Sequence, residues 1–241
     1  KRDVQKAFNY YSLASHQNHS PSQTKLGIFY EYGTYVKRDI SKAFYYYSLA
    51  ANQNDENAQY LLAKIYEKGE YVERDIQKAI HYYTLSADQN HFLAQYKLGI
   101  FYEKGIYVKR DIQKSFLYYS LAANSNYSYA QFLMAIFYIE GKIVSKDYDK
   151  AIRYFTLAAN KDHAHSQFIL GILYLNGLVL KQNIKKGIYL INLSLYNGNY
   201  EANFAIGFFH HQGKYFDKNI TKAIHYYKEA SSFNDQYSKN N

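Results

Sequence analysis

The chain contains no cysteine and no tryptophan, and it has no long apolar run. Without cysteine it can form neither a disulfide framework nor a cysteine-ligated zinc site. The longest apolar stretch, residues 168–175, is far shorter than the roughly 20 residues of a membrane-spanning helix. We therefore expect no insertion into a membrane. The chain also opens on Lys1, without a methionine or a signal-like apolar region, so we expect it to be an excised stretch of a longer protein.

What the chain does have is an internal repeat. Lysines recur at a constant spacing of 36 residues (42 − 6, 78 − 42 and so on), and an aspartate or asparagine lies three positions before each. Self-similarity of this period indicates a solenoid, in which each unit buries its apolar face against its neighbours. Such a fold offers extended surfaces rather than one deep pocket, which argues against an enzyme. The lysines are Lys6, Lys42, Lys78, Lys114, Lys150, Lys186 and Lys222.

One unit reads as two helices joined by a short loop. In residues 57–90, apolar residues at spacings of four, three and one form a helix face that ends at Gly69, where a positive φ costs least. Asp75 then caps a second helix, whose buried face carries the pair Tyr82 and Tyr83. The stop glycine, a small residue in the first helix and the aromatic pair return down the chain. The sequence therefore predicts an all-α fold, a right-handed superhelix of 36-residue helix-turn-helix repeats. Residues 1–241 would form one solenoid with seven second helices and six first helices.

This pattern resembles the Sel-1-like repeat, a relative of the tetratricopeptide repeat, over essentially the whole chain. In related repeats the family has a tryptophan before the tyrosine of the second helix, where this chain has residues such as Tyr82. The unit from Asn183 departs furthest, with Gly187 and Leu190 in place of alanine and tyrosine, so we expect a looser or kinked joint there. The positions that match in one unit are Ala94, Leu98, Gly99, Tyr102, Gly105, Val108, Asp111, Lys114, Tyr118, Tyr119, Ala122 and Ala123.

The resemblance implies a role in protein–protein interaction. Family members act as adaptors in signalling, as substrate-handling components of the degradation complex at the endoplasmic reticulum, and as fusions to kinase domains. We therefore expect an adaptor or scaffold that binds a protein or peptide. The alternative is a structural spacer or self-association module of a larger protein. A cytoplasmic location is expected, with the lumen of the endoplasmic reticulum as the alternative, which Asn-x-Ser/Thr triplets such as the one at Asn126 keep open.

In related repeats the first helices line the concave wall, so the ligand-facing residues should form a stripe along those helices. Positions at i, i+4 and i+7 share one helix face, and the i+7 column here is Glu31, Glu67, Glu103, Ile139, Leu175 and His211. The stripe either forms a groove for a peptide or packs on the neighbouring first helix, and the sequence leaves both open. The predicted partner-binding residues are Tyr60, Tyr96, Phe132, Phe168, Phe204, Lys64, Ile100, Ile136, Ile172 and Phe208.

A basic residue also recurs directly before each capping position except Asn183, which follows Gln182. On the solenoid this column would line one loop edge, either as a track for an acidic partner or as a solvated edge that pairs with Glu31, Glu67 and Glu103. The net charge of +9 comes without a recognised nucleic-acid module, so we do not expect a nucleic-acid partner. The residues of this basic edge are Arg38, Arg74, Arg110 and Lys146.

The sequence shows no catalytic or metal-binding constellation. The nine histidines contain no pair at the i, i+4 spacing of a two-histidine zinc helix, and His210 stands in a column of tyrosines, which predicts packing. The glycines follow the repeat and cannot build one phosphate cradle, and no nucleophile elbow or kinase signature is present. We therefore predict no enzyme activity, no catalytic residue, no metal and no cofactor.

Overall fold

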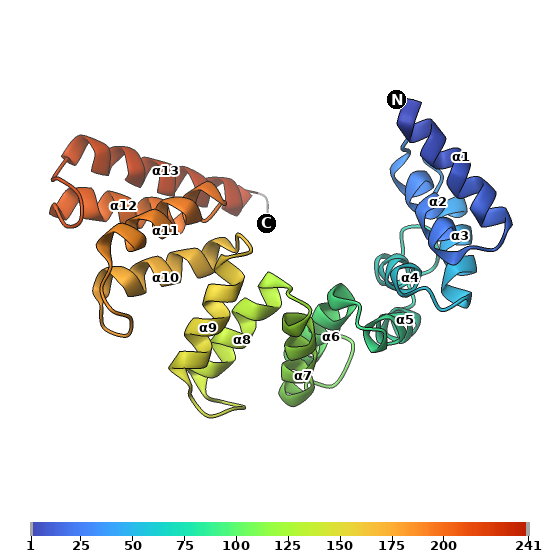
Figure 1. The fold of residues 1–241 in the computed structure, drawn as a ribbon, viewed down its shortest axis with the longest axis horizontal. Helices are drawn as coiled ribbons and strands as arrows, with labels where there is room; N and C mark the ends of the chain where they lie inside the picture. The colour runs from blue at the N-terminus through green and yellow to red at the C-terminus, as the bar shows by residue number, and fades with distance from the viewer. Residues whose placement is uncertain (1, 240–241) are drawn as a thin grey trace. The chain divides into compact units, whose positions relative to one another are not determined.

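The structure is a computed structural model that describes the backbone of residues 2–239 and the side chains of residues 3–232. Every regular element in this part of the chain is an α-helix (Figure 1). The predicted all-α repeat fold is therefore confirmed. The helices are α1 (Arg2–His16), α2 (Ser20–Tyr32), α3 (Ile40–Asn52), α4 (Glu56–Lys68), α5 (Ile76–Asp88), α6 (Phe92–Lys104), α7 (Ile112–Asn124), α8 (Ser128–Glu140), α9 (Tyr148–Ala159), α10 (Ala164–Asn176), α11 (Ile184–Tyr196), α12 (Glu201–Gln212) and α13 (Ile220–Lys239).

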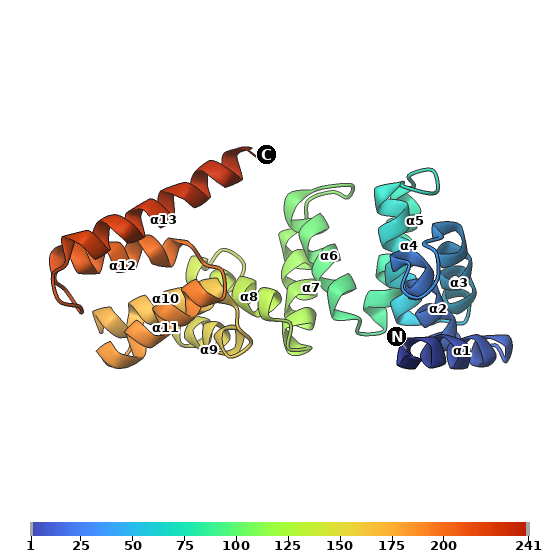
Figure 2. The ribbon, with the colours of Figure 1, turned by 90° about the horizontal axis from the view of Figure 1, so that it is seen from above.

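The chain divides into two compact units, Lys1–Ser125 and Asn126–Asn241. In each unit a first helix packs lengthwise on the second helix that follows it, as α12 does on α13 (Figure 2). The hairpins of the first unit are α2/α3, α4/α5 and α6/α7, and those of the second are α8/α9, α10/α11 and α12/α13. A single solenoid over residues 1–241 stays a prediction, and each unit is described here by itself.

The helix ends follow the predicted signals. Asp75 Oδ1 accepts a hydrogen bond from the backbone N–H of Lys78 at 2.9 Å and so caps α5. The first helices end on glycines whose φ lies between 66° and 70°, a left-handed conformation that strains a residue with a Cβ atom. Both signals are confirmed. The equivalent caps are Asp39, Asp111, Asp147, Asn183 and Asn219, and the stop glycines are Gly33, Gly69, Gly105, Gly141, Gly177 and Gly213.

The core repeats one contact between an aromatic ring of the second helix and a small residue of the first. Tyr47, Tyr83, Tyr119 and Phe155 are fully buried at this position. A Cβ atom built on Gly27 would lie 2.4 Å from the ring of Tyr47, so this close approach requires glycine. The predicted small-residue seam is therefore confirmed. It positions the first helix, and with it the predicted binding stripe, against the second helix of the same hairpin.

The lysine ladder belongs to this architecture. Lys78 Nζ lies 3.2 Å from Asp75 Oδ2 and 5.2 Å from the centre of the Tyr66 ring, which stacks on Tyr82 at 5.9 Å. Cation–π contacts of this kind contribute about 0.5–1 kcal/mol at exposed sites, so each lysine helps to hold its helical hairpin together. The same contact with a first-helix tyrosine is made by Lys42, Lys114, Lys150 and Lys186.

The α10/α11 hairpin is close-packed, whereas α11 packs on the following α12 less extensively than α3, α5 and α9 pack on the first helices that follow them, in agreement with the expected looser joint at the unit from Asn183. A Cβ atom on Gly187 would lie 2.9 Å from the carbonyl oxygen of Gly171 and 2.7 Å from the side chain of Leu175. Ile191 occupies the position of the buried ring and is itself buried. The two glycines let the helix backbones approach, and α11 continues unbroken from Ile184 to Tyr196.

Candidate functional site

In the first unit the rings of the predicted stripe are half-buried parts of the hairpins. The ring of Tyr60 lies 5.8 Å from Tyr83 of the second helix and stacks on His91 of the next loop at 4.6 Å. Lys64 is half-buried, with its Nζ 5.8 Å from the centre of the Tyr60 ring. The ring centre of Tyr96 lies 5.7 Å from that of Tyr119 in the second helix of the same repeat. Here the stripe packs on the second helix of its own repeat, and Tyr60 also packs against a core cluster that includes Leu98 of the neighbouring first helix, in agreement with the packing interpretation.

In the second unit the stripe rings are half-buried in the first two repeats and exposed in the last. Phe132 is half-buried, 5.8 Å from Phe155 and 4.8 Å from His163. Phe168 is half-buried against an apolar core that α10, α11 and α12 share, whereas the side chain of Phe204 is 61% exposed. The second predicted column behaves alike: Lys64, Ile100, Ile136 and Ile172 are half-buried, and Phe208 is exposed.

The i+7 column points into the hairpins except at His211, which is exposed, so the expectation that the whole column continues the binding stripe is wrong. Glu103 Oε2 accepts a hydrogen bond of 2.7 Å from the hydroxyl of the buried Tyr119. Leu175, in the same column, is completely buried. Because a buried hydroxyl needs a partner, the glutamate is tied to the core. The same bond, at 2.6 Å, joins Tyr47 to Glu31 and Tyr83 to Glu67.

The repeats themselves carried the signal for this pairing. Tyr47, Tyr83 and Tyr119 each have a glutamate sixteen positions earlier. Where the second-helix residue lacks a hydroxyl, as in Phe155 and Ile191, the same column holds Ile139 and Leu175 instead. The two columns change together because a half-buried carboxylate without a donor would be unfavourable. Burial, reinforced by the glutamate carboxylate, raises the pKa of the three tyrosines far above its ordinary value.

The basic edge is exposed, but its arginines are also bound within the repeat array. Arg38 Nε donates to the backbone carbonyl of Glu31 at 3.0 Å, and its Nη2 donates to the hydroxyl of Tyr71 in the next repeat at 3.0 Å. The glutamates are reached through their carbonyl oxygens, so the expected ion pairing with their carboxylates is wrong. Arg74 bonds equivalently to Glu67 and Tyr107, Arg110 bonds to Glu103, and Lys146 is exposed.

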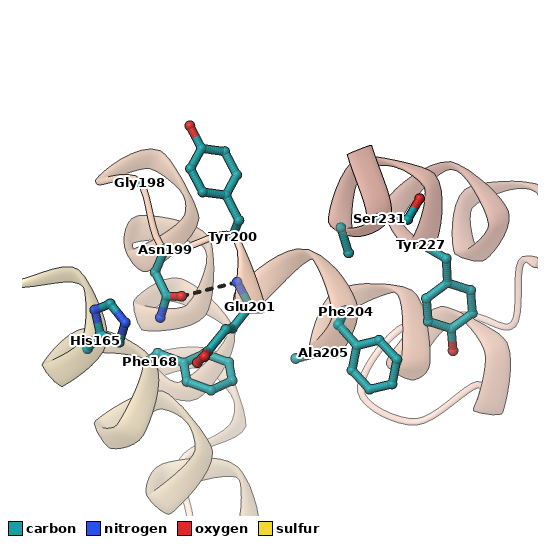
Figure 3. A pocket seen from close by; sticks show the side chains of 11 residues that line it. His165, Phe168, Gly198, Asn199, Tyr200, Glu201, Phe204, Ala205, Tyr227 and Ser231 are labelled. Atoms are coloured by element: carbon teal, nitrogen blue, oxygen red, sulfur yellow. Dashed lines mark hydrogen bonds between the residues drawn. The ribbon is translucent and has the colours of Figure 1, made fainter. Parts of the chain in front are cut away.

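The second unit contains a cavity of about 1020 Å³ at the exposed end of the stripe. Its walls come from α10, the loop before α12, α12 and α13. Figure 3 shows Phe204 facing Tyr227 on one side of the space, while Phe168 and Asn199 lie on the other. The ring centres of Phe204 and Tyr227 are 5.5 Å apart. Phe168 and Phe204 were predicted as binding residues, whereas the sequence reasoning missed Asn199 and Tyr227.

Asn199 is the most buried polar side chain of this cavity. It is 2% exposed, and its Oδ1 accepts a hydrogen bond from the backbone N–H of Glu201 at 3.1 Å. Its Nδ2 has no hydrogen-bond partner. Leaving such a donor unpaired costs about 1–3 kcal/mol, so the amide is a group that a ligand could satisfy.

His163 and His210 have structural roles, as a cap and as a stacking ring. His163 Nδ1 accepts from the backbone N–H of Ser166 at the start of α10, and burial, with His165 nearby, lowers the pKa of His163 to about 4. His210 is buried and stacks on Phe216 and Tyr226, in agreement with its predicted packing role. Among the described residues, no group of three or more His, Cys, Asp or Glu side chains is placed to hold a metal ion. No helix of the described chain has the length and apolar character to cross a bilayer.

The Sel1 repeat model matches residues 1–19, 20–55, 57–91, 93–127, 128–163, 164–199 and 201–232. The chain belongs to the Sel1 repeat family. Comparison with curated proteins gives no match. Sel1 repeats form helical scaffolds that commonly act as protein-interaction modules and generally lack enzymatic activity.

Two solved structures resemble this Sel1 repeat chain over nearly its whole length. A Sel1 repeat protein from Oxalobacter formigenes is 28% identical with a TM-score of 0.81, over 96% of this chain and 97% of that one. A protective antigen of uropathogenic Escherichia coli strains that displays an SLR fold is 25% identical with a TM-score of 0.81, over 93% of this chain. The match covers 48% of the antigen, so this chain spans about half of its length. These likenesses confirm the family resemblance and the fold.

Proposed function

We propose that this Sel1 repeat chain is a non-enzymatic adaptor that binds a partner polypeptide along its first-helix stripe, with the principal contact in the second unit. The observation that supports this is the change along the stripe. Tyr60 and Phe132 lie under rings of their own repeat and of the next loop, whereas Phe204 is exposed beside a cavity of about 1020 Å³. Exposed aromatic side chains beside an apolar-walled cavity are typical of binding sites.

The basic edge supports a secondary contact with an acidic segment of the partner. Arg38 and Arg74 each donate Nε–H to a backbone carbonyl and Nη2–H to the hydroxyl of a tyrosine in the next repeat, yet both side chains stay exposed. Exposed charges of one sign accelerate and orient association more than they add affinity. A cytoplasmic location remains part of the proposal.

A peptide selection tests the proposal. Random peptides displayed on phage are selected against the chain, and the affinity of a recovered peptide is measured by fluorescence anisotropy. Phe204→Ala should weaken binding at least tenfold, because it removes an exposed aromatic anchor. Tyr189→Ala is the matched control, since Tyr189 is 62% exposed on α11 and does not line the cavity. Failure to recover any peptide, or equal affinities for the two variants, would contradict the proposal. Circular dichroism checks that both variants keep their helices.

A further inference from the structure

Loop residues between repeats cover the stripe residue that precedes them. The loop residue lies 31 positions after the stripe residue, as in the hydrogen bond of 3.0 Å that Thr24 donates to Asp55. His91 stacks on Tyr60 in the same relation, and the ring of His163 lies 4.8 Å from that of Phe132. At these joints a side chain of the protein itself occupies the space over the stripe.

Asn199 occupies the equivalent position after Phe168 and has no ring to place there. The cavity of about 1020 Å³ lies at this joint, with Phe168 and Asn199 among its walls. Figure 3 shows the amide of Asn199 next to Phe168 and His165. The buried Nδ2 of Asn199 is unpaired, whereas Oδ1 is held by the N–H of Glu201. The joint thus lacks both a covering ring and a hydrogen-bond acceptor.

We propose that a partner peptide supplies both groups. An aromatic side chain of the peptide packs over Phe168, where His91 and His163 cover the stripe at other joints. Asn199 Nδ2 is buried in the free chain, so a backbone carbonyl of the peptide accepts its hydrogen bond once the side chains that cover it have moved. The inference rests on the proposed function and specifies the chemistry of the partner. The cavity has the size of pockets that bury most of a small ligand, which is enough for one aromatic residue and its flanking peptide groups.

Charge specifies the partner further. Glu201 is exposed at the cavity and is the carboxylate among its described lining residues. A lysine or arginine next to the aromatic residue of the peptide would lie close to this carboxylate, whereas an acidic neighbour would be repelled. The expected ligand is therefore a segment with an aromatic residue beside a basic one, although the chain as a whole carries a net charge of +9.

Three capped dipeptides test the inference on the full chain by NMR titration. The probes are N-acetyl-Lys-Phe-N-methylamide, N-acetyl-Lys-Ala-N-methylamide and N-acetyl-Glu-Phe-N-methylamide. The Lys-Phe probe should shift the side-chain amide signals of Asn199 and the ring signals of Tyr227. It should also bind at least tenfold more tightly than the Lys-Ala probe and several-fold more tightly than the Glu-Phe probe. Shifts of the Asn199 amide that do not depend on phenylalanine would overturn the inference.

Two substitutions at Asn199 separate its roles. Asn199→Asp keeps the acceptor for the N–H of Glu201 but removes the donor, and should weaken binding of the Lys-Phe probe roughly tenfold. Asn176→Asp adds the same charge at the exposed end of α10, outside the cavity, and should leave binding unchanged. Asn199→His should place a ring over Phe168 and abolish binding while the melting temperature stays equal or rises. Unchanged binding by Asn199→His would sink the idea even if Asn199→Asp failed to fold.

The remaining outcomes distinguish this inference from the proposed function. Selected peptides that depend on Phe204 but leave the Asn199 signals unmoved would overturn the inference and leave the proposed function standing. Binding of the Lys-Phe probe at Asn199, with no peptide recovered by selection, would overturn the proposed function and leave the inference standing. Shifts of the Asn199 signals on dilution of the chain alone would assign the cavity to a second copy and overturn the inference.

Discussion

Each buried tyrosine hydroxyl of the first unit is matched to one carboxylate. Tyr119 donates to Glu103, and the second unit replaces this pair by Phe155 and Ile139. Both arrangements satisfy the same requirement, because a polar group is buried only with its partner or not at all. The residue types at the two positions are therefore coupled, although each column by itself looks like a simple variation between polar and apolar.

We expect Tyr119→Phe to lower the free energy of unfolding by about 1–2 kcal/mol, because Glu103 then loses its donor in a half-buried site. Adding Glu103→Ile should recover most of this loss, since the pair then copies Ile139 and Phe155. Urea unfolding of the two single variants and the double variant measures the coupling. Strictly additive effects would show that the two residues act independently.

The same tyrosines predict a loss of stability at alkaline pH. Burial raises the pKa of Tyr119 in the folded chain, so the unfolded chain releases this proton first, at about pH 10. The stabilisation is complete below that pH and falls as the pH rises toward the folded pKa, by about 1.4 kcal/mol per pH unit for each tyrosine. Between pH 10 and 11, the free energy of unfolding should fall less steeply with pH in Tyr119→Phe than in the parent. The difference in slope should be about 1.4 kcal/mol per pH unit, which corresponds to one proton. The exposed Tyr189, changed to Phe, should leave the slope unaltered.

His163 predicts the opposite behaviour in acid. Burial, with His165 nearby, lowers the pKa of His163 to about 4, whereas the unfolded chain binds this proton near pH 6.5. The contribution of His163 to stability is thus present above about pH 6.5 and is lost as the pH falls toward 4. His163→Asn, which copies Asn199, should flatten the decline of the melting temperature between pH 7 and 4.5. The exposed His225, changed to Asn, should leave the decline intact.

At the scale of the element, three loops hold tyrosine in a left-handed backbone conformation. The φ angles are 70° at Tyr35, 66° at Tyr107 and 69° at Tyr215. This conformation costs a residue with a Cβ atom roughly 1–2 kcal/mol. The ring of Tyr107 compensates, because it lies edge-on to Phe101 at 5.4 Å and its hydroxyl accepts from Arg74 of the preceding repeat. In these loops a contact between repeats therefore offsets the cost of the strained backbone conformation.

Substitutions in this loop should separate strain from contact. Both Tyr107→Ala and Tyr107→Gly lose the ring, but only glycine also relieves the strained φ, so Tyr107→Gly should be more stable than Tyr107→Ala by about 1 kcal/mol. At Tyr71, which lies outside the positive-φ set, the order should be reversed. Urea unfolding of the four variants decides the matter, and the same order at both positions would contradict this account.

At the scale of the molecule, the two compact units should respond separately to a local defect. A Cβ atom on Gly171 would lie 2.6 Å from Ile191 and 3.1 Å from the carbonyl oxygen of Gly187, so Gly171→Ala should force α10 and α11 apart. Because the stability of repeat arrays is built from neighbour contacts, amide protection should fall within residues 126–232 and stay unchanged in residues 3–125. Hydrogen exchange measured by mass spectrometry reports both regions. An equal loss of protection in both would show that the chain unfolds as one.

The sequence by itself determined the architecture. The capping aspartates, stop glycines and small-residue seam were predicted because these roles depend on backbone conformation and close approach within one hairpin, which recur with the repeat. The stripe could be located by helical spacing alone, since spacing decides which residues share a face.

Only the tertiary structure decided which of these residues are available. Whether a stripe ring is covered depends on a loop residue 31 positions later, as in Phe132 under His163, and helix periodicity does not report that contact. The same holds for Glu103. Helical spacing placed it on the stripe, but its carboxylate points into the hairpin and accepts a hydrogen bond from the hydroxyl of Tyr119. The cavity beside Phe168 is lined by residues of consecutive repeats, Asn199 among them, so it lies in the packing between repeats rather than in any one helix.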